Sequence, residues 1–257
     1  SSSRALPPRR GIAMWSAKKN PYLKRKPPKG PETDPLRIAA FDAMKEMLII
    51  EEGVSVVKCV KCMRNFFDDA EVMREAVYHL AVKAITHSRD LVAHGGLEAG
   101  LIAMNRHGKN ERLQFDGCEM LWRCSMDEDG RKAVLDQGGL QAVLGALSLH
   151  TESVRVMEEA CGALRWLAET ETQRVMSDGG LDAVLRVMNM QMQFSWVAMW
   201  GCGALLCFSQ IDAKTVQDLG GFATIHEALK RHSDCPEVVR LGQLALKLDP
   251  AVRKTLR

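Results

Sequence analysis

The chain has 257 residues, 46% of them hydrophobic and 26% charged, which indicates a soluble globular protein of one or two domains. Its eight cysteines are scattered along the sequence, so the pattern excludes a small disulfide-built scaffold and favours a reducing compartment. The net charge of +3 hides an asymmetry, because residues 1–34 carry nine Lys or Arg and two acids, whereas residues 35–257 carry more acids than bases.

Residues 1–34 form a Pro-rich basic arm without helical or strand periodicity. Six prolines interrupt it, and its net charge is +7. A segment with so little apolar surface does not offset the entropy lost on folding, so we expect a partner to order it. Its candidate contact residues are Arg9, Arg10, Trp15, Lys18, Lys19, Tyr22, Lys24, Arg25 and Lys26.

Three interpretations of the arm stay open. It is an assembly tail laid over a protein partner, a nuclear-localisation-like cluster, or a segment that binds RNA through phosphate contacts and base stacking, as in a ribosomal assembly. The chain begins with Ser1 rather than Met, so we expect that a preceding segment was removed or numbered away. The acid-poor start suits the region after an organellar transit peptide, which favours a mitochondrion or plastid over the cytoplasm.

After the arm, apolar residues recur at helical spacing, and the sequence predicts a helix over residues 35–52 that covers one end of the domain. Beyond it, a pair of adjacent glycines returns every 41 to 43 residues. The pairs are Gly95-Gly96, Gly138-Gly139, Gly179-Gly180 and Gly220-Gly221. Glycine tolerates the positive φ that often follows a helix end, so each pair predicts a sharp turn between two helices.

The residues after each pair repeat with the period of an α-helix. Leu140, Val143, Leu144 and Leu147 follow the spacing i, i+3, i+4, i+7 of one helix face, and the segment from Leu181 repeats it. No run alternates with period two for long, so the sequence predicts no sheet. A self-similar period in the forties is typical of a helical solenoid.

These units resemble armadillo repeats, in which a short helix, a Gly-Gly turn, a second helix, a polar bend and a long third helix follow one another. The resemblance covers about residues 35–257 and is closest over residues 139–179. It implies an all-α fold, an armadillo-type right-handed α-solenoid of about five repeats after an irregular arm. HEAT repeats are the nearest alternative, but they lack the glycine turn. The expected repeats are 53–95, 96–138, 139–179, 180–220 and 221–257.

Armadillo proteins of the importin-α type bind extended peptides through ladders of Trp and Asn on their third helices. The Trp positions here hold Tyr78, Glu119, Gly162, Gly203 and Gly242, and the Asn positions hold Val82, Arg123, Trp166, Cys207 and Leu246. The resemblance is therefore to an importin-α or β-catenin-like solenoid without the ladder, and we do not expect cargo import. The three glycines predict close approach, either by a partner chain or by neighbouring helices.

No pattern of catalytic residues occurs in the sequence. Cys59 and Cys62 form a C-x-x-C motif, but a structural zinc usually needs a second such pair, which is absent. There is no phosphate-binding loop, no G-x-S-x-G and no H-E-x-x-H motif. We therefore expect a non-enzymatic protein that uses no cofactor and binds no metal.

Residues 187–211 contain no Asp, Glu, Lys or Arg, which predicts an apolar docking patch in the fourth repeat. The segment stays in phase with the repeats, so we do not expect a transmembrane helix. Contact with a membrane surface is less favoured than contact with a protein partner. Positions that are polar in the third repeat are apolar here, and we expect them to face outward rather than fold into the core. They hold Met192, Phe194, Trp196, Met199 and Trp200. The other predicted partner-binding residues, on the third helices, are Gly203, Cys207, Trp166 and Arg123.

Together these features favour an interaction scaffold, an accessory or structural subunit of a larger multiprotein complex, with an organelle as the favoured location. The scaffold would dock protein subunits through its concave face and the fourth-repeat patch, with the arm as assembly tail. The alternative is an RNA-contacting component that uses the basic arm.

Overall fold

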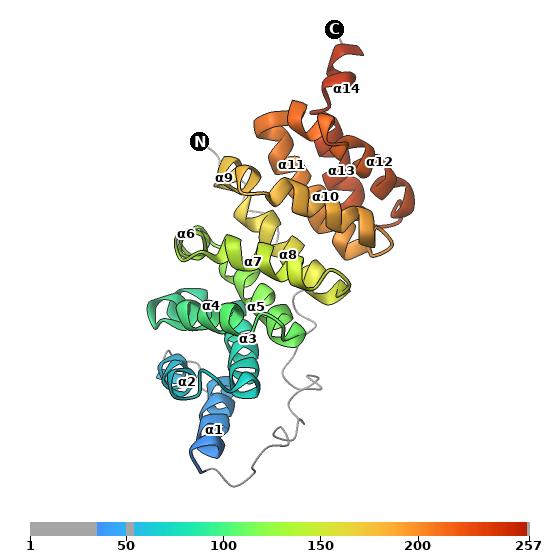
Figure 1. Ribbon diagram of the computed structural model, residues 1–257. Helices are drawn as coiled ribbons and strands as arrows, with labels where there is room; N and C mark the ends of the chain where they lie inside the picture. The colour runs from blue at the N-terminus through green and yellow to red at the C-terminus, as the bar shows by residue number, and fades with distance from the viewer. Residues whose placement is uncertain (1–34, 50–53, 256–257) are drawn as a thin grey trace. The chain divides into compact units, whose positions relative to one another are not determined.

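A computed structural model describes residues 35–49 and 54–255, so the basic arm with all of its candidate contact residues lies outside the described part. The fold of the described residues is all-α, as predicted, and they form helices and no strand (Figure 1). The first seven helices are α1 (Pro35–Ile49), α2 (Val54–Asn65), α3 (Ala70–Ala93), α4 (Gly96–Arg106), α5 (Glu111–Cys124), α6 (Glu128–Asp136) and α7 (Gly139–Leu149). The others are α8 (Val154–Leu167), α9 (Thr172–Ser177), α10 (Gly180–Gln191), α11 (Ser195–Asp218), α12 (Gly221–Arg231), α13 (Pro236–Leu246) and α14 (Pro250–Thr255).

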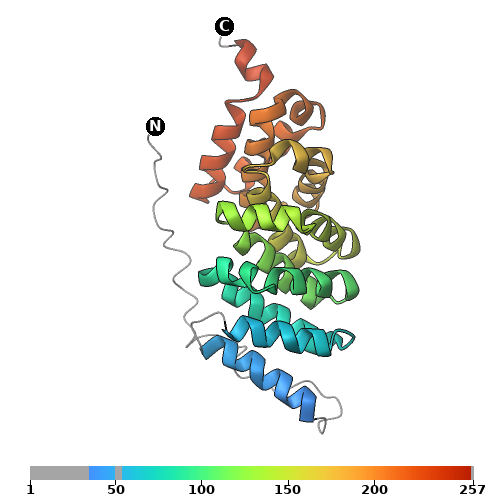
Figure 2. The same cartoon turned by 90° about the vertical axis from the view of Figure 1, so that its left-hand side faces the viewer.

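Ten of the helices within residues 35–49 and 54–255 pack in two rows that follow the chain (Figures 1 and 2). One row consists of the turn helices α4, α7, α10 and α12, which begin at the Gly-Gly pairs and contact one another in sequence, with α2 before α4. The other row consists of the face helices α3, α5, α8, α11 and α13, which also contact one another in sequence. Equivalent positions of successive helices therefore lie next to each other.

The first glycine of each pair has a left-handed backbone conformation, with φ from +75° to +98°. It is the N-cap of the turn helix, and its carbonyl accepts the first helical bond, as from Ala99 N to Gly95 O at 3.0 Å. The second glycine meets a different constraint, because a Cβ on Gly139 would lie 2.4 Å from Val134 Cγ1 and 2.8 Å from the Val134 carbonyl oxygen. The predicted turns are confirmed, and two separate physical reasons require the two glycines.

Each Gly-Gly turn follows a short helical segment. α6 and α9 are such segments, and in α3 and α11 a kink separates the segment from the long helix before it. The kinks lie at His87 (φ −136°, ψ 43°) and Asp212 (φ −142°, ψ 79°). The Asp212 carboxylate caps the new segment, because it accepts hydrogen bonds from the backbone N–H and the hydroxyl of Thr215 at 3.0 and 2.6 Å.

Three histidines at the ends of turn helices make the same hydrogen bond to the loop one unit earlier in the chain. The Nε2 atoms of His107, His150 and His232 lie 2.9, 2.7 and 2.7 Å from the carbonyl oxygens of Phe67, Gly108 and Met192. A carbonyl oxygen only accepts, so Nε2 carries the hydrogen in each case. The equivalent residue of α10 is Gln191, whose amide oxygen instead accepts from Gln193 Nε2 at 2.8 Å.

The histidine bond should contribute measurably to stability. We expect His150→Ala to lower the free energy of unfolding by about 1 kcal/mol, because it removes one bond and leaves the partly buried Gly108 carbonyl without its donor. Urea denaturation followed by circular dichroism measures this change. His226 is exposed on α12, so His226→Ala is the control and should change stability by less than about 0.5 kcal/mol. Equal losses in the two variants would show that the bond is not stabilising.

Candidate interaction surface

All four tryptophans of the described residues lie on three consecutive face helices. Trp122 is on α5, Trp166 is on α8, and Trp196 and Trp200 are on α11. These helices pack side by side, so residues far apart in the sequence are brought together. We call the surface that carries Trp122, Trp166 and Trp200 the tryptophan face. Trp and Arg are enriched among the residues that dominate binding energy in protein interfaces.

Trp122 and Trp200 meet across α8 above Gly162. Their ring centroids are 5.8 Å apart and the ring planes are inclined by 45°. A Cβ on Gly162 would lie 3.6 Å from atoms of both indoles, which is ordinary van der Waals contact. The missing side chain at Gly162 therefore leaves the space that the rings from α5 and α11 occupy.

The other two glycines of this register are also covered by side chains of the same domain. A Cβ on Gly203 would lie 2.6 Å from Arg165 Cδ, and a Cβ on Gly242 would lie 2.8 Å from Leu229 Cδ2. The close approach that the sequence predicted at these positions is thus made by neighbouring helices.

A partly buried carboxyl group lies beside the tryptophan pair. The indole N–H of Trp122 donates a hydrogen bond to Glu159 Oε2. Burial raises the pKa of Glu159 to about 8, and the nearby charge of Glu119 adds to the rise. Burial likewise raises the pKa of Asp116 to about 7, although Arg112 Nε, at 3.2 Å from Asp116 Oδ2, acts in the opposite direction. Both carboxyls therefore titrate near neutral pH.

Arginines lie over two of the tryptophan rings. The guanidinium of Arg123 is 4.9 Å from the ring centroid of Trp122, and the same side chain forms an ion pair with Glu119. Trp166 has Arg131 at 5.9 Å and Arg165 at 5.6 Å from its ring centroid. These distances are within the range of cation–π attraction, which holds the rings in place. A surface ordered in advance loses less entropy when it binds.

Some residues of the predicted fourth-repeat patch are exposed in the structure and others are buried. Phe194 and Trp196 are 41% and 57% exposed, as expected. Met192 and Trp200 were also expected to face outward, and that prediction is wrong, because they are 5% and 9% exposed. The Met192 carbonyl accepts the hydrogen bond of His232, so its loop is held against the next unit, and Trp200 packs on Trp122.

The remaining predicted contact residues are less accessible than the sequence indicated. Gly203 is buried beneath Arg165, and Cys207 is buried, which raises the pKa of its thiol. Met199, Trp166 and Arg123 are half-buried. They therefore present only part of each side chain to solvent.

Four exposed apolar side chains lie where the turn helices end and α11 begins. We call Leu149, Met190, Phe194 and Trp196 the apolar edge; they are 57%, 45%, 41% and 57% exposed. Leu149 and Met190 occupy equivalent positions of α7 and α10, which contact each other. The edge is therefore a feature of two neighbouring units.

Phe194 occupies a position that is polar in the earlier units. Asp69, Asn110 and Ser153 are the N-caps of α3, α5 and α8, and each accepts a hydrogen bond from a backbone N–H of its helix. Phe194 is the N-cap of α11 and makes no side-chain cap bond. Such a cap is worth about 1 kcal/mol, so helix stability alone does not explain a phenylalanine here.

Sequence reasoning did not select Trp122, Asp116 or Glu159. A signal was present, because Asp116, Glu159 and Trp200 all lie twenty residues after the second glycine of their pair. A carboxylate at the same inward-facing position in two units is unusual unless it has a partner.

All eight cysteines are free, and six of them are buried. Burial raises the pKa of the Cys124, Cys161 and Cys202 thiols to about 12. The cysteines therefore behave mainly as small apolar residues. In the part of the chain that the structure describes, no three His, Cys, Asp or Glu side chains gather as a metal site would require.

No protein-family model and no curated protein matches the chain. Among solved structures, it is similar to the crystal structure of an engineered protein, a target of the Northeast Structural Genomics Consortium. The TM-score is 0.68 at 22% sequence identity, and the match covers 85% of this chain and 92% of that chain. At this identity the similarity shows the fold alone. The chain is therefore assigned to the class of all-α proteins. Across residues 35–49 and 54–255, no helix is both long and apolar enough to cross a bilayer.

Proposed function

We propose that this chain is a non-enzymatic interaction scaffold of the armadillo type, a right-handed α-solenoid of about five repeats that serves as a subunit of a larger protein assembly. The order of a short helix, a Gly-Gly turn, a turn helix and a face helix supports the armadillo assignment. The ordered contacts within each row support a solenoid, because repeats of this kind contact mainly their neighbours.

The apolar edge is the observation that carries the docking function. Its four large apolar side chains lie in neighbouring units and are 41% or more exposed. Contiguous exposed apolar side chains mark interaction sites more often than isolated ones do. The fold does not require Phe194, since the corresponding N-cap position holds a capping residue in three other units.

The tryptophan face supports the same proposal. Its half-buried rings, Trp122 and Trp166, are held by arginines, and Trp122 also by Glu159, so their accessible parts form a rigid surface. Trp196 is on the same helix, α11, as Trp200, which places the apolar edge beside this face. A partner that covered both would bury the aromatic groups that most often dominate binding energy.

Replacing Trp196 by a charge should separate binding from folding. We expect Trp196→Glu to weaken partner binding by roughly a hundredfold, because a hot-spot residue is worth about 2 kcal/mol or more. The side chain is 57% exposed, so the helical circular dichroism and the melting temperature should stay close to those of the wild type. Quantitative mass spectrometry of proteins that co-purify with the chain identifies the partner, and calorimetry with that partner measures the affinity.

Ile211→Glu is the matched control, because Ile211 is 54% exposed on the same helix but lies outside the apolar edge. It should leave the affinity unchanged. Wild-type affinity in Trp196→Glu would place the docking site elsewhere. Trp200 is unsuitable for this test, since a charge at a 9% exposed position beside Trp122 would disturb the fold itself.

A further inference from the structure

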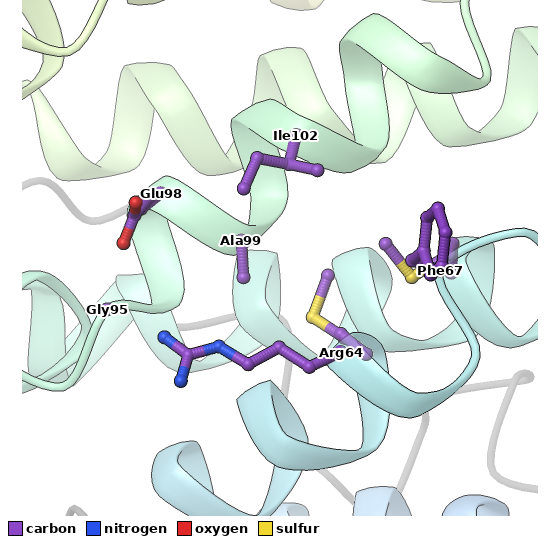
Figure 3. Close-up of a pocket in the computed structure, with 8 residues that line it drawn as sticks. Arg64, Phe67, Gly95, Glu98, Ala99 and Ile102 are labelled. Carbon is purple, nitrogen blue, oxygen red and sulfur yellow. The ribbon is translucent and has the colours of Figure 1, made fainter.

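A small apolar groove lies between α2 and α4, away from the tryptophan face. Its volume is about 240 Å³. Figure 3 shows Ile102 on one side and Phe67 at one end, with Arg64 and Glu98 toward the other end. Met63, Met73 and Ala99 complete its apolar lining.

One side of the groove is a continuous stripe of α4. Gly95, Glu98, Ala99 and Ile102 follow the spacing i, i+3, i+4, i+7, so they lie along one face of the helix. The groove therefore runs parallel to α4 for about two turns, or roughly 10 Å. Phe67 and Ile102 are 44% and 50% exposed, although both are large and apolar.

The other units provide an internal comparison for these two residues. Phe67 lies two residues before the N-cap of a face helix, and Ile102 lies seven residues after the positive-φ glycine of a turn helix. The corresponding pairs are Gly108 with Gly145, Thr151 with Arg186, and Met192 with Glu227. None of these pairs consists of two large apolar residues. The packing between turn helices therefore does not require Phe67 and Ile102.

The two ends of the groove differ in charge. At one end Arg106 lies 4.5 Å from the ring centroid of Phe67 and forms an ion pair with Asp68. At the other end Arg64 and Glu98 are exposed on opposite sides of the groove, and within the described residues neither forms an ion pair. A complementary partner would therefore bring one acidic and one basic residue to the same end.

We propose that this groove docks an amphipathic helix of another protein, which inserts two large apolar side chains spaced one turn apart. The helix carries an acidic residue opposite Arg64 and a basic residue opposite Glu98. Two anchors at i and i+4 fit along the α4 side of the groove, as in other helix-in-groove interfaces. Methionines in the lining adapt to the shape of such anchors.

A helix fits better than the other classes of occupant. The groove is smaller than the roughly 300–1,000 Å³ of typical small-molecule pockets, and it is open along its length. Its walls are α2 and α4, whose interior backbone groups are bonded within the helices, and the α2–α3 loop, where the Phe67 carbonyl already accepts from His107 Nε2. An extended peptide would find few backbone partners there, whereas a helix satisfies its own backbone hydrogen bonds.

A displayed library of helical peptides tests this proposal. Each peptide has leucines at two positions one turn apart and randomised flanking positions, and a second library has alanine at both. We expect enrichment from the leucine library alone, with one acidic and one basic residue at the same end. Binding of the selected peptide should fall at least tenfold in Ile102→Asp. It should be unchanged in Ile85→Asp, which alters an exposed residue of α3 outside the groove.

Charge reversal keeps the test independent of any effect on folding. Arg64→Glu should weaken binding of the selected peptide. The same variant should bind more tightly a version of the peptide in which Lys replaces the acidic residue. Failure to enrich leucine peptides, or equal binding to the wild type and Ile102→Asp, would overturn the proposal. Trp196→Glu leaves this groove intact, so the outcome is separate from that of the docking test at the apolar edge.

Discussion

Gly139→Ala should destabilise the protein by about 3 kcal/mol, although it adds a single methyl group. The new Cβ would lie 2.4 Å from Val134 Cγ1 and 2.8 Å from the Val134 carbonyl oxygen. A side-chain methyl can rotate away, but the carbonyl belongs to the backbone of α6, so the whole turn would have to open. Because α6 and α7 each contact other helices, such a shift would spread beyond the turn.

Gly145→Ala is the matched control, since both glycines are in α7. A Cβ on Gly145 would meet no atom within 4 Å. Alanine is favoured over glycine inside a helix, so this variant should gain about 0.5–1 kcal/mol. Urea denaturation followed by circular dichroism distinguishes the opposite signs. A loss in both variants would mean that general helix strain, and not the contact with Val134, explains the second glycine of each pair.

Stability should fall as the pH rises from about 4.5 to about 8, and Glu159→Gln should remove much of this dependence. Burial raises the pKa of Glu159 to about 8 in the folded chain from an ordinary value of 4.5. Below pH 4.5 the carboxyl is protonated in both the folded and the unfolded state. Between the two values only the folded state keeps the proton, so each step up in pH favours unfolding.

Asp116 adds to the same dependence, because burial raises its pKa from 3.8 to about 7. Glutamine at position 159 has no proton to lose, and its amide oxygen still accepts from the Trp122 indole. We expect the variant to match the wild type near pH 4 and to exceed it near pH 9 by on the order of 2–4 kcal/mol. That difference corresponds to roughly 5–15 °C in melting temperature for a domain of this size.

Melting curves at several pH values in one buffer series measure this effect. Glu152→Gln is the control, since Glu152 is exposed at the bend before α8 and its substitution should leave the pH profile unchanged. An identical profile for Glu159→Gln and the wild type would show that Glu159 is ionised in the folded chain at neutral pH. The Trp122 bond would then be charge-assisted.

The sequence by itself determined the features that depend on local backbone chemistry. The all-α fold followed from apolar spacing of three and four residues, because that spacing places side chains on one helix face. The turn positions followed from the glycine pairs, because positive φ at Gly95, Gly138, Gly179 and Gly220 is an intrinsic preference of that residue. The second glycine of each pair was visible as a pattern, although its cause is a contact with the preceding helix.

Only the tertiary structure decided which side chains of α11 are exposed. The sequence grouped Trp196 and Trp200 on one helix face, but one is 57% exposed and the other 9%. The difference arises from Trp122, which is seventy-eight residues earlier and reaches Trp200 across Gly162. No periodicity within α11 contains that information, since the ring that covers Trp200 belongs to another helix.

The groove and the two carboxyls with raised pKa could not be predicted from the sequence, for the same physical reason. Phe67 lies in the α2–α3 loop and Ile102 in α4, and each alone resembles an ordinary apolar residue. The raised pKa of Glu159 depends on burial beneath neighbouring helices and on Glu119 of α5. A repeat sequence determines the unit and its turns, whereas the chemistry of its surface arises from side chains that meet only when the units stack.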